Sequence, residues 1–256
     1  VLQLSPEQDR ESFIQQYGLG DIAQSFEEFP LITAEIGQEE LDAIQADPAL
    51  QALQEDVLFA PTLFQSVPLI GADDVWNTYG YNGSGVAVVV LDTGVNKSHP
   101  AFQNRVVSEA CYSTHNPGSN VFSLCPGSVQ SITGNDTGLD CSDAIAGCGH
   151  GTHVAGIVAA NDALGDGVAP GADIIAIQVF SEFTNAGTCG SDPVPCVRSY
   201  FSDILEGLQR AYALRSTYTI GAVSMSIGGG YYTTSCDGSF SSMKGAIDDL
   251  WNANIP

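Results

Sequence analysis

A run of glycine and apolar residues, Gly85 to Leu91, ends in the polar turn Asp92-Thr93-Gly94. A continuous β-branched run of this length is typical of a parallel strand buried on both faces. Similar runs over 172–180 and 223–227 predict two more strands, and an apolar face repeated along 201–214 predicts a helix between them. This alternation predicts an α/β fold with a doubly wound, mostly parallel sheet.

The first 64 residues have a different pattern. Residues 6–17 predict a helix that begins at Ser5 and stops at Gly18. The elements expected after it are two strands, a helix and a strand, over 23–29, 31–36, 39–45 and 57–60. This order predicts a small α+β unit, ferredoxin-like but lacking one leading strand.

Two polar stretches, 102–149 and 181–199, are expected to be surface loops. They hold six of the seven cysteines, and cysteines in a loop-rich secreted protein are typical of disulfides. Local pairing predicts three bridges: Cys189 with Cys196, Cys111 with Cys125, and Cys141 with Cys148. Cys236 is left without a predicted partner.

The stretch from Gly149 to Ala160 places His150 at the start of a helix that is apolar and small-sided all round, and therefore buried. An imidazole held there can act as a general base, and a strand-end carboxylate such as Asp92 can orient it. In the alternative interpretation, His150 is a core histidine and Asp92 caps a turn. A zinc site is disfavoured, because His150 and His153 do not have the four-residue spacing and intervening Glu of zinc-protease helices.

Five blocks occur in a fixed order: 88–95, Ser98-His99-Pro100, 149–160, 167–172 and 223–229. Together they resemble the subtilisin-like serine proteases (subtilases). The resemblance implies that Asp92 is the orienting carboxylate and His150 the general base of an Asp-His-Ser triad. It also implies that Ser226, Ile227 and Gly228 form the segment that pairs with the substrate backbone.

The family's nucleophile block, Gly-Thr-Ser-Met-Ala, does not occur in the chain. Ser241-Ser242-Met243-Lys244 lacks the flanking residues and falls in a helix expected over 240–252. We therefore expect a chain clipped at both ends, with its serine and oxyanion asparagine beyond Pro256, and inactive alone. The alternative is a catalytically inactive proenzyme fragment that acts only as a binding or inhibitory module.

The resemblance further implies a propeptide over residues 1–64, acting as folding chaperone and intramolecular inhibitor, and the first part of the catalytic domain over 65–256. An ordinary accessory domain is the alternative for the first segment. The start of mature subtilisins resembles the sequence after Phe64, so we expect autocleavage between Phe64 and Gln65. No cofactor is expected to be required. The family's usual calcium ligand is replaced by Ala101, which makes calcium at that site doubtful, and no metal ligands are predicted.

The chain carries 30 Asp and Glu against 7 Lys and Arg, a formal charge of -23. Such a charge argues against nucleic acid or an anionic membrane as a partner. The sequence contains no apolar run of about 18 residues, the length needed to span a bilayer. These features fit an extracellular, secreted protein. The resemblance to subtilases implies that its partners are polypeptide substrates and its own propeptide.

Overall fold

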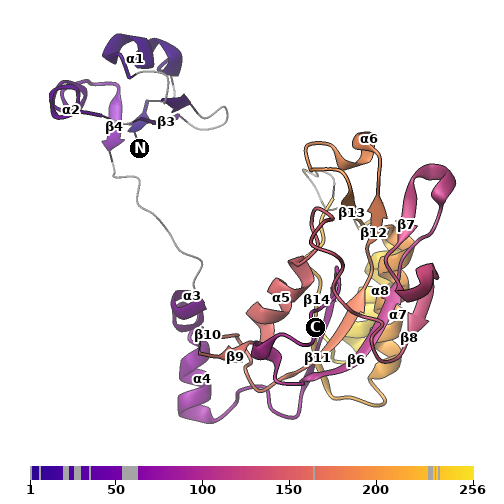
Figure 1. Cartoon of the computed structure of the whole chain (residues 1–256). Helices are drawn as coiled ribbons and strands as arrows, with labels where there is room; N and C mark the ends of the chain where they lie inside the picture. Colours follow the sequence, from indigo (N-terminus) through magenta and orange to yellow (C-terminus); the bar gives the residue numbers. More distant parts are fainter. Residues whose placement is uncertain are drawn as a thin grey trace. The chain divides into compact units, whose positions relative to one another are not determined.

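The computed structural model describes residues 2–5, 7–19, 23–25, 30–34, 36–53, 63–163, 165–229, 233, 235 and 237–256 (Figure 1). The chain divides into two compact units, an N-terminal unit (Val1–Pro61) and a C-terminal unit (Thr62–Pro256). The division falls after Pro61, close to the boundary after Phe64 that the sequence suggested. Each unit has its own apolar core.

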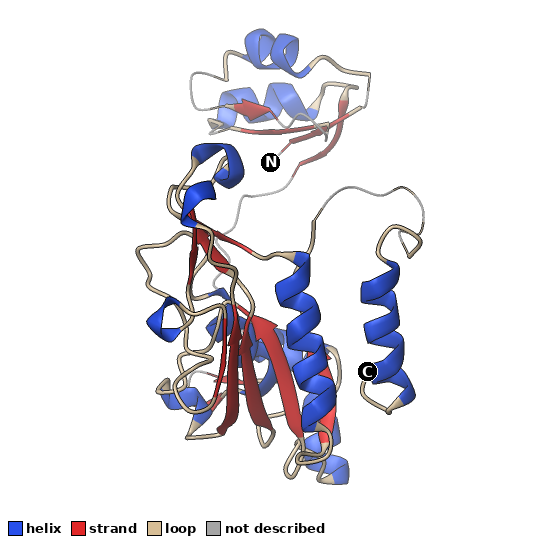
Figure 2. Ribbon diagram, turned by 90° about the vertical axis from the view of Figure 1, so that its right-hand side faces the viewer, coloured by secondary structure: helices blue, strands red, loops and turns tan. Residues whose placement is uncertain are grey.

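The C-terminal unit is built on a five-stranded sheet with the order β14-β5-β11-β6-β8. Its strands are β5 (Ala87–Asp92), β6 (Val106–Tyr112), β8 (Ser131–Thr133), β11 (Asp173–Gln178) and β14 (Ile220–Ser224). Parallel pairing joins β14, β5, β11 and β6, and only β8 is antiparallel. Figure 2 shows the strands of this sheet with helices packed beside them. The predicted α/β fold with a mostly parallel sheet is confirmed.

Helices cover both faces of the sheet (Figure 1). On one face α7 (Phe201–Leu214) and α8 (Ser241–Asn252) pack over side chains such as Leu91 and Ile177. On the other, α5 (His150–Ala159) and the short helix η1 (Pro100–Phe102) pack over Val90 and Ile174. Successive side chains of a strand point to opposite faces, so the continuous apolar run of β5 supplies both cores. The sheet is therefore doubly wound.

The stretches expected to be surface loops contain regular structure, so that expectation is wrong in part. Strand β6 belongs to the main sheet, and a second sheet has the order β13-β12-β7. Its strands, all antiparallel, are β7 (Val121–Ser123), β12 (Ser181–Phe183) and β13 (Cys196–Arg198), with α6 (Ala186–Cys189) between the last two. A small apolar cluster that includes Val121, Phe183 and two disulfide cysteines holds this sheet together.

The remaining elements of the C-terminal unit are short. Helices α3 (Leu63–Leu69) and α4 (Ala72–Tyr79) precede β5. The 3-10 helices η2 (Pro117–Ser119) and η3 (Pro126–Ser128) flank β7, and a two-stranded hairpin, β9 (Asn161–Asp162) and β10 (Gly165–Asp166), follows α5. No helix among the described residues is both long and apolar enough to cross a membrane.

The N-terminal unit has the element order β1 (Leu2–Leu4), α1 (Arg10–Tyr17), β2 (Gln24–Ser25), β3 (Leu31–Thr33), α2 (Gln38–Gln45) and β4 (Leu50–Leu53). Its antiparallel sheet has the order β2-β3-β1-β4, the split βαβ arrangement of ferredoxin-like folds. The leading strand is present as β1, so the expectation that it was missing is wrong. Its two apolar side chains, Leu2 and Leu4, are fully buried against Phe13.

Two local details of the N-terminal unit also differ from the predictions. Helix α1 begins at Asp9 and not at Ser5, because the Asp9 carboxylate accepts a hydrogen bond from the backbone N–H of Ser12 at 2.6 Å. Its end at Gly18 is as predicted. The last described strand is β4, whereas the strand expected over 57–60 lies outside the described residues.

Candidate active site

Strand β5 delivers Asp92 to the carboxyl edge of the sheet. Asp92 pairs with Gln178 at the end of β11 and is fully buried. The backbone N–H of Thr93 donates to its Oδ1 at 2.7 Å, while Oδ2 has no hydrogen-bond partner among the described residues. Sites in open α/β sheets form outside this edge, where strands end and helices begin.

Helix α5 begins with His150 against this strand end. Gly149, the residue before it, has a φ of +89°, a conformation that favours glycine. Gly151 lies so close to the turn after β5 that an added Cβ would stand 2.3 Å from the carbonyl oxygen of Gly94. The Gly151 N–H donates to Thr93 Oγ1 at 2.9 Å, which fixes the first turn of the helix on the turn after Asp92.

The two predicted side chains meet. Nδ1 of His150 lies 2.7 Å from Oδ1 of Asp92, across 58 residues of sequence. The carboxylate side chain is 1% exposed, whereas the imidazole side chain is 47% exposed. The half-exposed ring argues against a core histidine. When Nδ1–H donates to the carboxylate, Nε2 is left as the basic nitrogen, which is the arrangement a general base requires.

The predicted substrate segment follows β14. The sequence predicted a strand over 223–227, but β14 ends at Ser224, so Ser226 and the two residues after it lie beyond the strand. Ser224 pairs with Val90, which places Ser226 near the same sheet edge as Asp92.

Ile227 and Gly228 line an apolar pocket of about 630 Å³. The pocket is lined by side chains from α7, α8, the segment before α8 and the residues just after β14, among them Phe201, Met225, Phe240 and Met243. Ser241 and Ser242 begin α8, so the serines that the sequence excluded as a nucleophile are helical. An apolar pocket beside the sheet edge could receive a hydrophobic side chain of a ligand.

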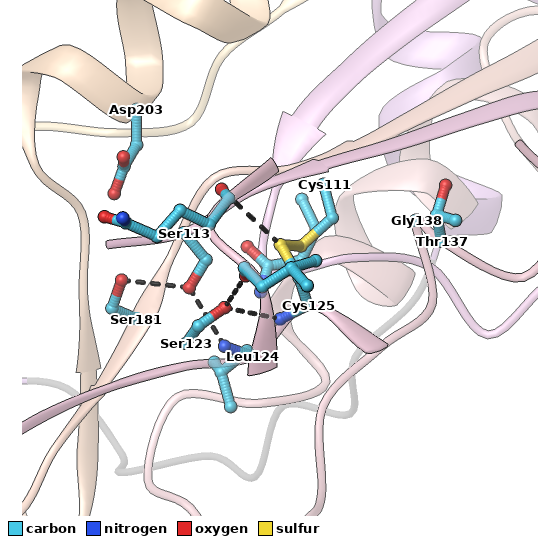
Figure 3. Close-up of a disulfide and its surroundings, with 12 residues drawn as sticks. Cys111, Ser113, Ser123, Leu124, Cys125, Thr137, Gly138, Ser181 and Asp203 are labelled. Carbon is cyan, nitrogen blue, oxygen red and sulfur yellow. Dashed lines mark hydrogen bonds between the residues drawn. A yellow bond between two sulfur atoms is a disulfide. The ribbon is translucent and has the colours of Figure 1, made fainter. Parts of the chain in front are cut away.

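All three predicted disulfides are formed in the structure: Cys111–Cys125, Cys141–Cys148 and Cys189–Cys196. Cys236 lies outside the described residues. Around the first bridge, Figure 3 shows a buried polar network in which the hydroxyls of Ser113 and Ser181 lie 3.0 Å apart and Leu124 N–H donates to Ser113 Oγ at 2.9 Å. This network ties the chain after β6 to β12.

Asp203 of α7 anchors the same region. Its two carboxylate oxygens accept hydrogen bonds from the backbone N–H and the hydroxyl of Thr114, at 3.0 and 3.1 Å. Burial raises the pKa of the Asp203 carboxyl, and the two hydrogen bonds from Thr114 oppose that shift. The carboxylate therefore holds the chain after β6 on the start of α7.

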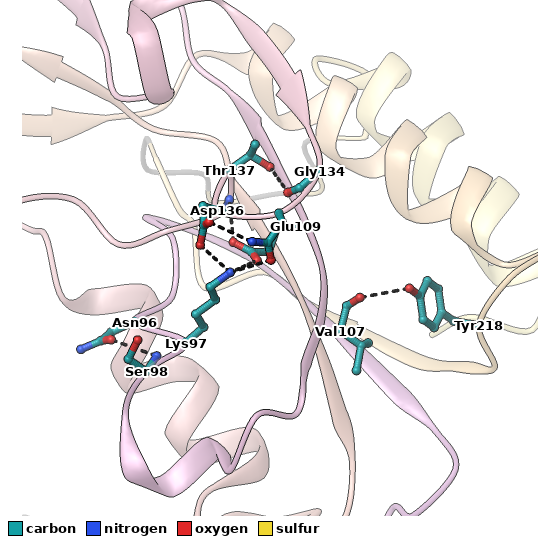
Figure 4. Close-up of polar contacts among 11 residues, drawn as sticks. Asn96, Lys97, Ser98, Val107, Glu109, Gly134, Asp136, Thr137 and Tyr218 are labelled. Carbon is teal, nitrogen blue, oxygen red and sulfur yellow. Dashed lines mark hydrogen bonds and ion pairs between the residues drawn. The ribbon is translucent and has the colours of Figure 1, made fainter.

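Lys97 links the turn after Asp92 to β6 and to the loop after β8 (Figure 4). Its Nζ lies 2.6 Å from Glu109, 2.7 Å from Asp136 and 2.9 Å from the side-chain oxygen of Asn135. The hydrogen bonds to Asp136 and Glu109 raise the pKa of Lys97. The ammonium compensates the buried charge of Glu109 inside the main sheet.

Phe64 and Gln65, the predicted cleavage pair, lie in the first turn of α3. A protease cleaves a peptide bound in an extended form. Cleavage between them therefore requires that this turn unwinds, and the position remains a prediction.

The residues around Ala101 do not fit a calcium ion. Its carbonyl oxygen accepts from Arg105 Nη2 at 2.9 Å, and the same guanidinium donates to the carbonyl oxygens of Ala159 and Ala172. These carbonyls are thus bound to a cationic side chain, which would repel a divalent cation. Among the described residues, no group of three His, Cys, Asp or Glu side chains is placed to hold a metal.

The fold thus brings a buried carboxylate and a half-exposed imidazole into hydrogen-bonding contact at the carboxyl edge of an α/β sheet. Residues 83–254 match a family profile described as "Subtilase family". The chain is 34% identical over 197 residues to an "Alkaline protease" of Alkalihalobacillus alcalophilus, covering 75% of this chain and 40% of that protein. It is 31% identical over 178 residues to the "Major intracellular serine protease" of Bacillus subtilis (strain 168), covering 68% of this chain and 44% of that protein.

Among solved structures, one named "Sphericase" matches with a TM-score of 0.45 and 25% identity, over 72% of this chain and 49% of that one. The chain spans less than half the length of the curated relatives named above. The family match covers most of the chain, so the chain belongs to the subtilase family.

Proposed function

We propose that this chain supplies the Asp and His of a secreted serine endopeptidase that hydrolyses peptide bonds with an Asp-His-Ser triad. The contact of 2.7 Å between His150 Nδ1 and Asp92 Oδ1 carries the proposal. The proposed triad takes its serine from outside this chain, whose sequence holds no Gly-Thr-Ser block. Family membership and protease relatives support this assignment.

In this mechanism Nε2 of His150 takes the proton of the serine hydroxyl as the serine oxygen attacks the peptide carbonyl carbon. The protonated imidazole then gives that proton to the leaving amine, and a water molecule hydrolyses the acyl-enzyme by the same route. Asp92 keeps the imidazole in the correct tautomer and stabilises its charged form. No step requires a metal or an organic cofactor.

The proposed substrates are polypeptides. Ser226, Ile227 and Gly228 would pair with an extended substrate backbone, the usual way in which a peptide is added to a strand edge. The apolar pocket beside Ile227 would take a hydrophobic side chain of that substrate. Nucleic acid and anionic membranes are not proposed as partners, because the formal charge is -23.

An extracellular location is supported by the three disulfides, which persist in oxidising compartments. Relatives do not decide this point alone, because one of them is named an intracellular protease.

We further propose that residues 1–64 act as a propeptide that inhibits the enzyme until the bond between Phe64 and Gln65 is cut. The ferredoxin-like topology of the N-terminal unit supports a separate, chaperone-like domain. Mass spectrometry of the secreted mature protein tests this: we expect Gln65 as its first residue. A first residue beyond Trp76 would contradict the proposed junction.

The experiment for the main proposal uses the whole reading frame that contains this chain. We expect hydrolysis of casein and covalent labelling by a fluorophosphonate, and we expect both to be abolished in a His150→Ala variant. A correctly folded protein that neither cleaves casein nor reacts with the label would instead support the second candidate, an inactive binding or inhibitory module. That candidate rests on the absence of the nucleophile block from this chain.

A further inference from the structure

Helix α5 carries His150 but has no side-chain cap of its own. The residue at its N-cap is Gly149, and a glycine offers no side chain to the unpaired N–H groups of the first turn. A carboxylate from outside the helix can satisfy such donors, and its charge is favourable at a helix N-terminus. Asp140, which lies in the loop before the helix, provides this carboxylate.

Asp140 forms hydrogen bonds with residues on both sides of His150. Its Oδ1 accepts from the backbone N–H of Gly149 at 3.0 Å, and its Oδ2 accepts from the hydroxyl of Thr152 at 2.5 Å. Gly149 precedes the histidine and Thr152 follows it by two positions. Asp140 therefore binds the chain on both sides of the general base, through a backbone N–H and a side-chain hydroxyl, while it lies outside the helix.

The same contacts reach the turn that carries Asp92. Thr152 Oγ1 donates to Asp140 and also accepts from the backbone N–H of Asn96 at 2.8 Å. Asn96 lies in the turn after β5, four residues beyond Asp92. A continuous set of hydrogen bonds thus joins Asp140, the start of α5 and the turn after Asp92, the two elements whose separation sets the contact between His150 and Asp92.

The disulfide Cys141–Cys148 closes this arrangement. Cys141 follows Asp140 directly, and its N–H donates to Asp140 Oδ1 at 2.9 Å. Cys148 directly precedes Gly149, so the bridge joins the carboxylate-bearing end of the loop to the helix-bearing end. Ala146, inside the loop, exchanges backbone hydrogen bonds of 2.8 and 3.0 Å with Pro195 and Val197, which anchors the loop on β13.

We propose that Asp140, fixed by the Cys141–Cys148 loop, is a positioning residue for His150. This proposal rests on the proposed protease function. Asp140 acts through the helix start: it keeps the imidazole aligned with Asp92 and with the incoming hydroxyl. A displacement of about 1 Å in a catalytic group can lower turnover by about 100-fold. When the contacts of Asp140 are removed, kcat should therefore fall while KM stays nearly constant.

The test compares Asp140→Ala and Asp140→Asn with Asp143→Ala in the whole enzyme. Asp143 is an exposed carboxylate of the same loop, so its replacement changes the charge equally. We expect Asp140→Ala to lower kcat by about 10- to 100-fold with KM within about twofold. Asp140→Asn should lose less, because its amide oxygen still accepts from Gly149 N–H. Asp143→Ala should retain the parent kcat.

A spectroscopic measurement separates this proposal from the proposed function. The proton shared by His150 Nδ1 and Asp92 gives a low-field NMR resonance whether or not the protein cleaves peptides. We expect Asp140→Ala to weaken or abolish this resonance, Asp92→Ala to abolish it, and Asp143→Ala to keep it. If the parent protein lacks protease activity but this pattern holds, the proposed function fails and the positioning role stands.

The double variant Cys141→Ser/Cys148→Ser tests the role of the loop. The bridge and Asp140 hold the same helix start, so their effects on kcat should not be independent. When Asp140→Ala is added to the double cysteine variant, the total fall in kcat should be smaller than the product of the two separate falls. If the two effects on kcat simply multiply, the bridge and Asp140 act independently, and the proposed coupling between them is wrong. A folded Asp140→Ala variant with parent kcat and an unchanged resonance would overturn the proposal. If that variant does not fold, an Asp140→Asn variant with parent kcat and resonance does so instead.

Discussion

Gly151 and Gly94 come so close that the first turn of α5 can meet the end of β5 only without a side chain at Gly151. We expect Gly151→Ala to lower the free energy of unfolding by about 1–3 kcal/mol, because overpacking moves the backbone. It should also lower kcat/KM of the whole enzyme, because the helix that carries His150 moves away from Asp92. Urea unfolding and peptide hydrolysis measure the two effects.

The matched control is Gly156→Ala in the same helix, where an added Cβ meets no atom within 4 Å. Alanine is a better helix former than glycine by about 1 kcal/mol, so this variant should be neutral or more stable. Equal destabilisation by both substitutions would show that helix propensity, and not the close approach to Gly94, explains the result.

The carboxylate of Asp92 is the next test. Asp92→Asn keeps the size of the side chain but favours the wrong imidazole tautomer, so kcat of the whole enzyme should fall by about 10⁴-fold. Circular dichroism should show an unchanged fold. Asp166→Asn, at an exposed position in β10, is the control and should retain activity. Retention of more than a tenth of the activity by Asp92→Asn would rule out the assigned role.

Lys97 compensates a buried carboxylate, so its loss should be costly. Lys97→Met leaves Glu109, whose side chain is 4% exposed, without its cation. Breaking a buried ion pair from one side costs about 3 kcal/mol, which urea unfolding would detect. Lys97→Met/Glu109→Gln removes both charges and should recover part of that loss. A single variant as stable as the parent would show that solvent already compensates Glu109.

The same ammonium predicts a loss of stability at high pH. Its contacts with Asp136 and Glu109 raise the pKa of Lys97 above the value of the unfolded chain, about 10.4. The stabilisation is therefore complete below that pH and is lost as pH rises through the higher folded pKa. The stability difference between the parent and Lys97→Met should be constant from pH 7 to 9 and shrink above about 10.4.

The stability that Asp203 contributes depends on pH in the opposite way from that of a carboxyl whose pKa is lowered by folding. Burial raises the pKa of its carboxyl in the folded state, so folding favours the protonated form. Its contribution to stability is greatest below the unfolded pKa of about 3.9 and declines as pH rises through the folded pKa. Asp203→Asn removes this dependence. Its stability relative to the parent should rise between pH 4 and pH 7 in thermal unfolding.

A stability difference that stays constant or falls over this range would show that the hydrogen bonds from Thr114 outweigh the burial of Asp203. Asp143→Asn, at an exposed loop position, serves as the control for the general loss of one negative charge.

The sequence predicted the main strands because β5 and β11 are unbroken apolar runs, and it predicted the pair Asp92 and His150 because a strand end and a glycine-flanked helix start are both local features. Strand β6 was missed because Ser108 and Glu109 interrupt its apolar residues. A glutamate is tolerated there because Lys97, which lies twelve residues earlier in sequence, forms an ion pair with it. Tertiary contacts of this kind cannot be read from local pattern.

The missed role of Asp140 has the same origin. Nothing in the residues around it distinguishes it from Asp143, and its link to Thr152 arises only when the loop folds back on α5. The disulfide pairs were predictable because their partners are neighbours in sequence.

Each disulfide joins cysteines only 7 or 14 positions apart. One bridge begins in the central sheet itself, because Cys111 lies in β6, and the other two join residues of the peripheral segments. These segments are not independent of one another, because β7 and β13 both pair with β12 and Ala146 is hydrogen-bonded to Pro195 and Val197. A redesign that replaces one of these segments must therefore preserve its pairing with the other two, so the three are best exchanged as a set.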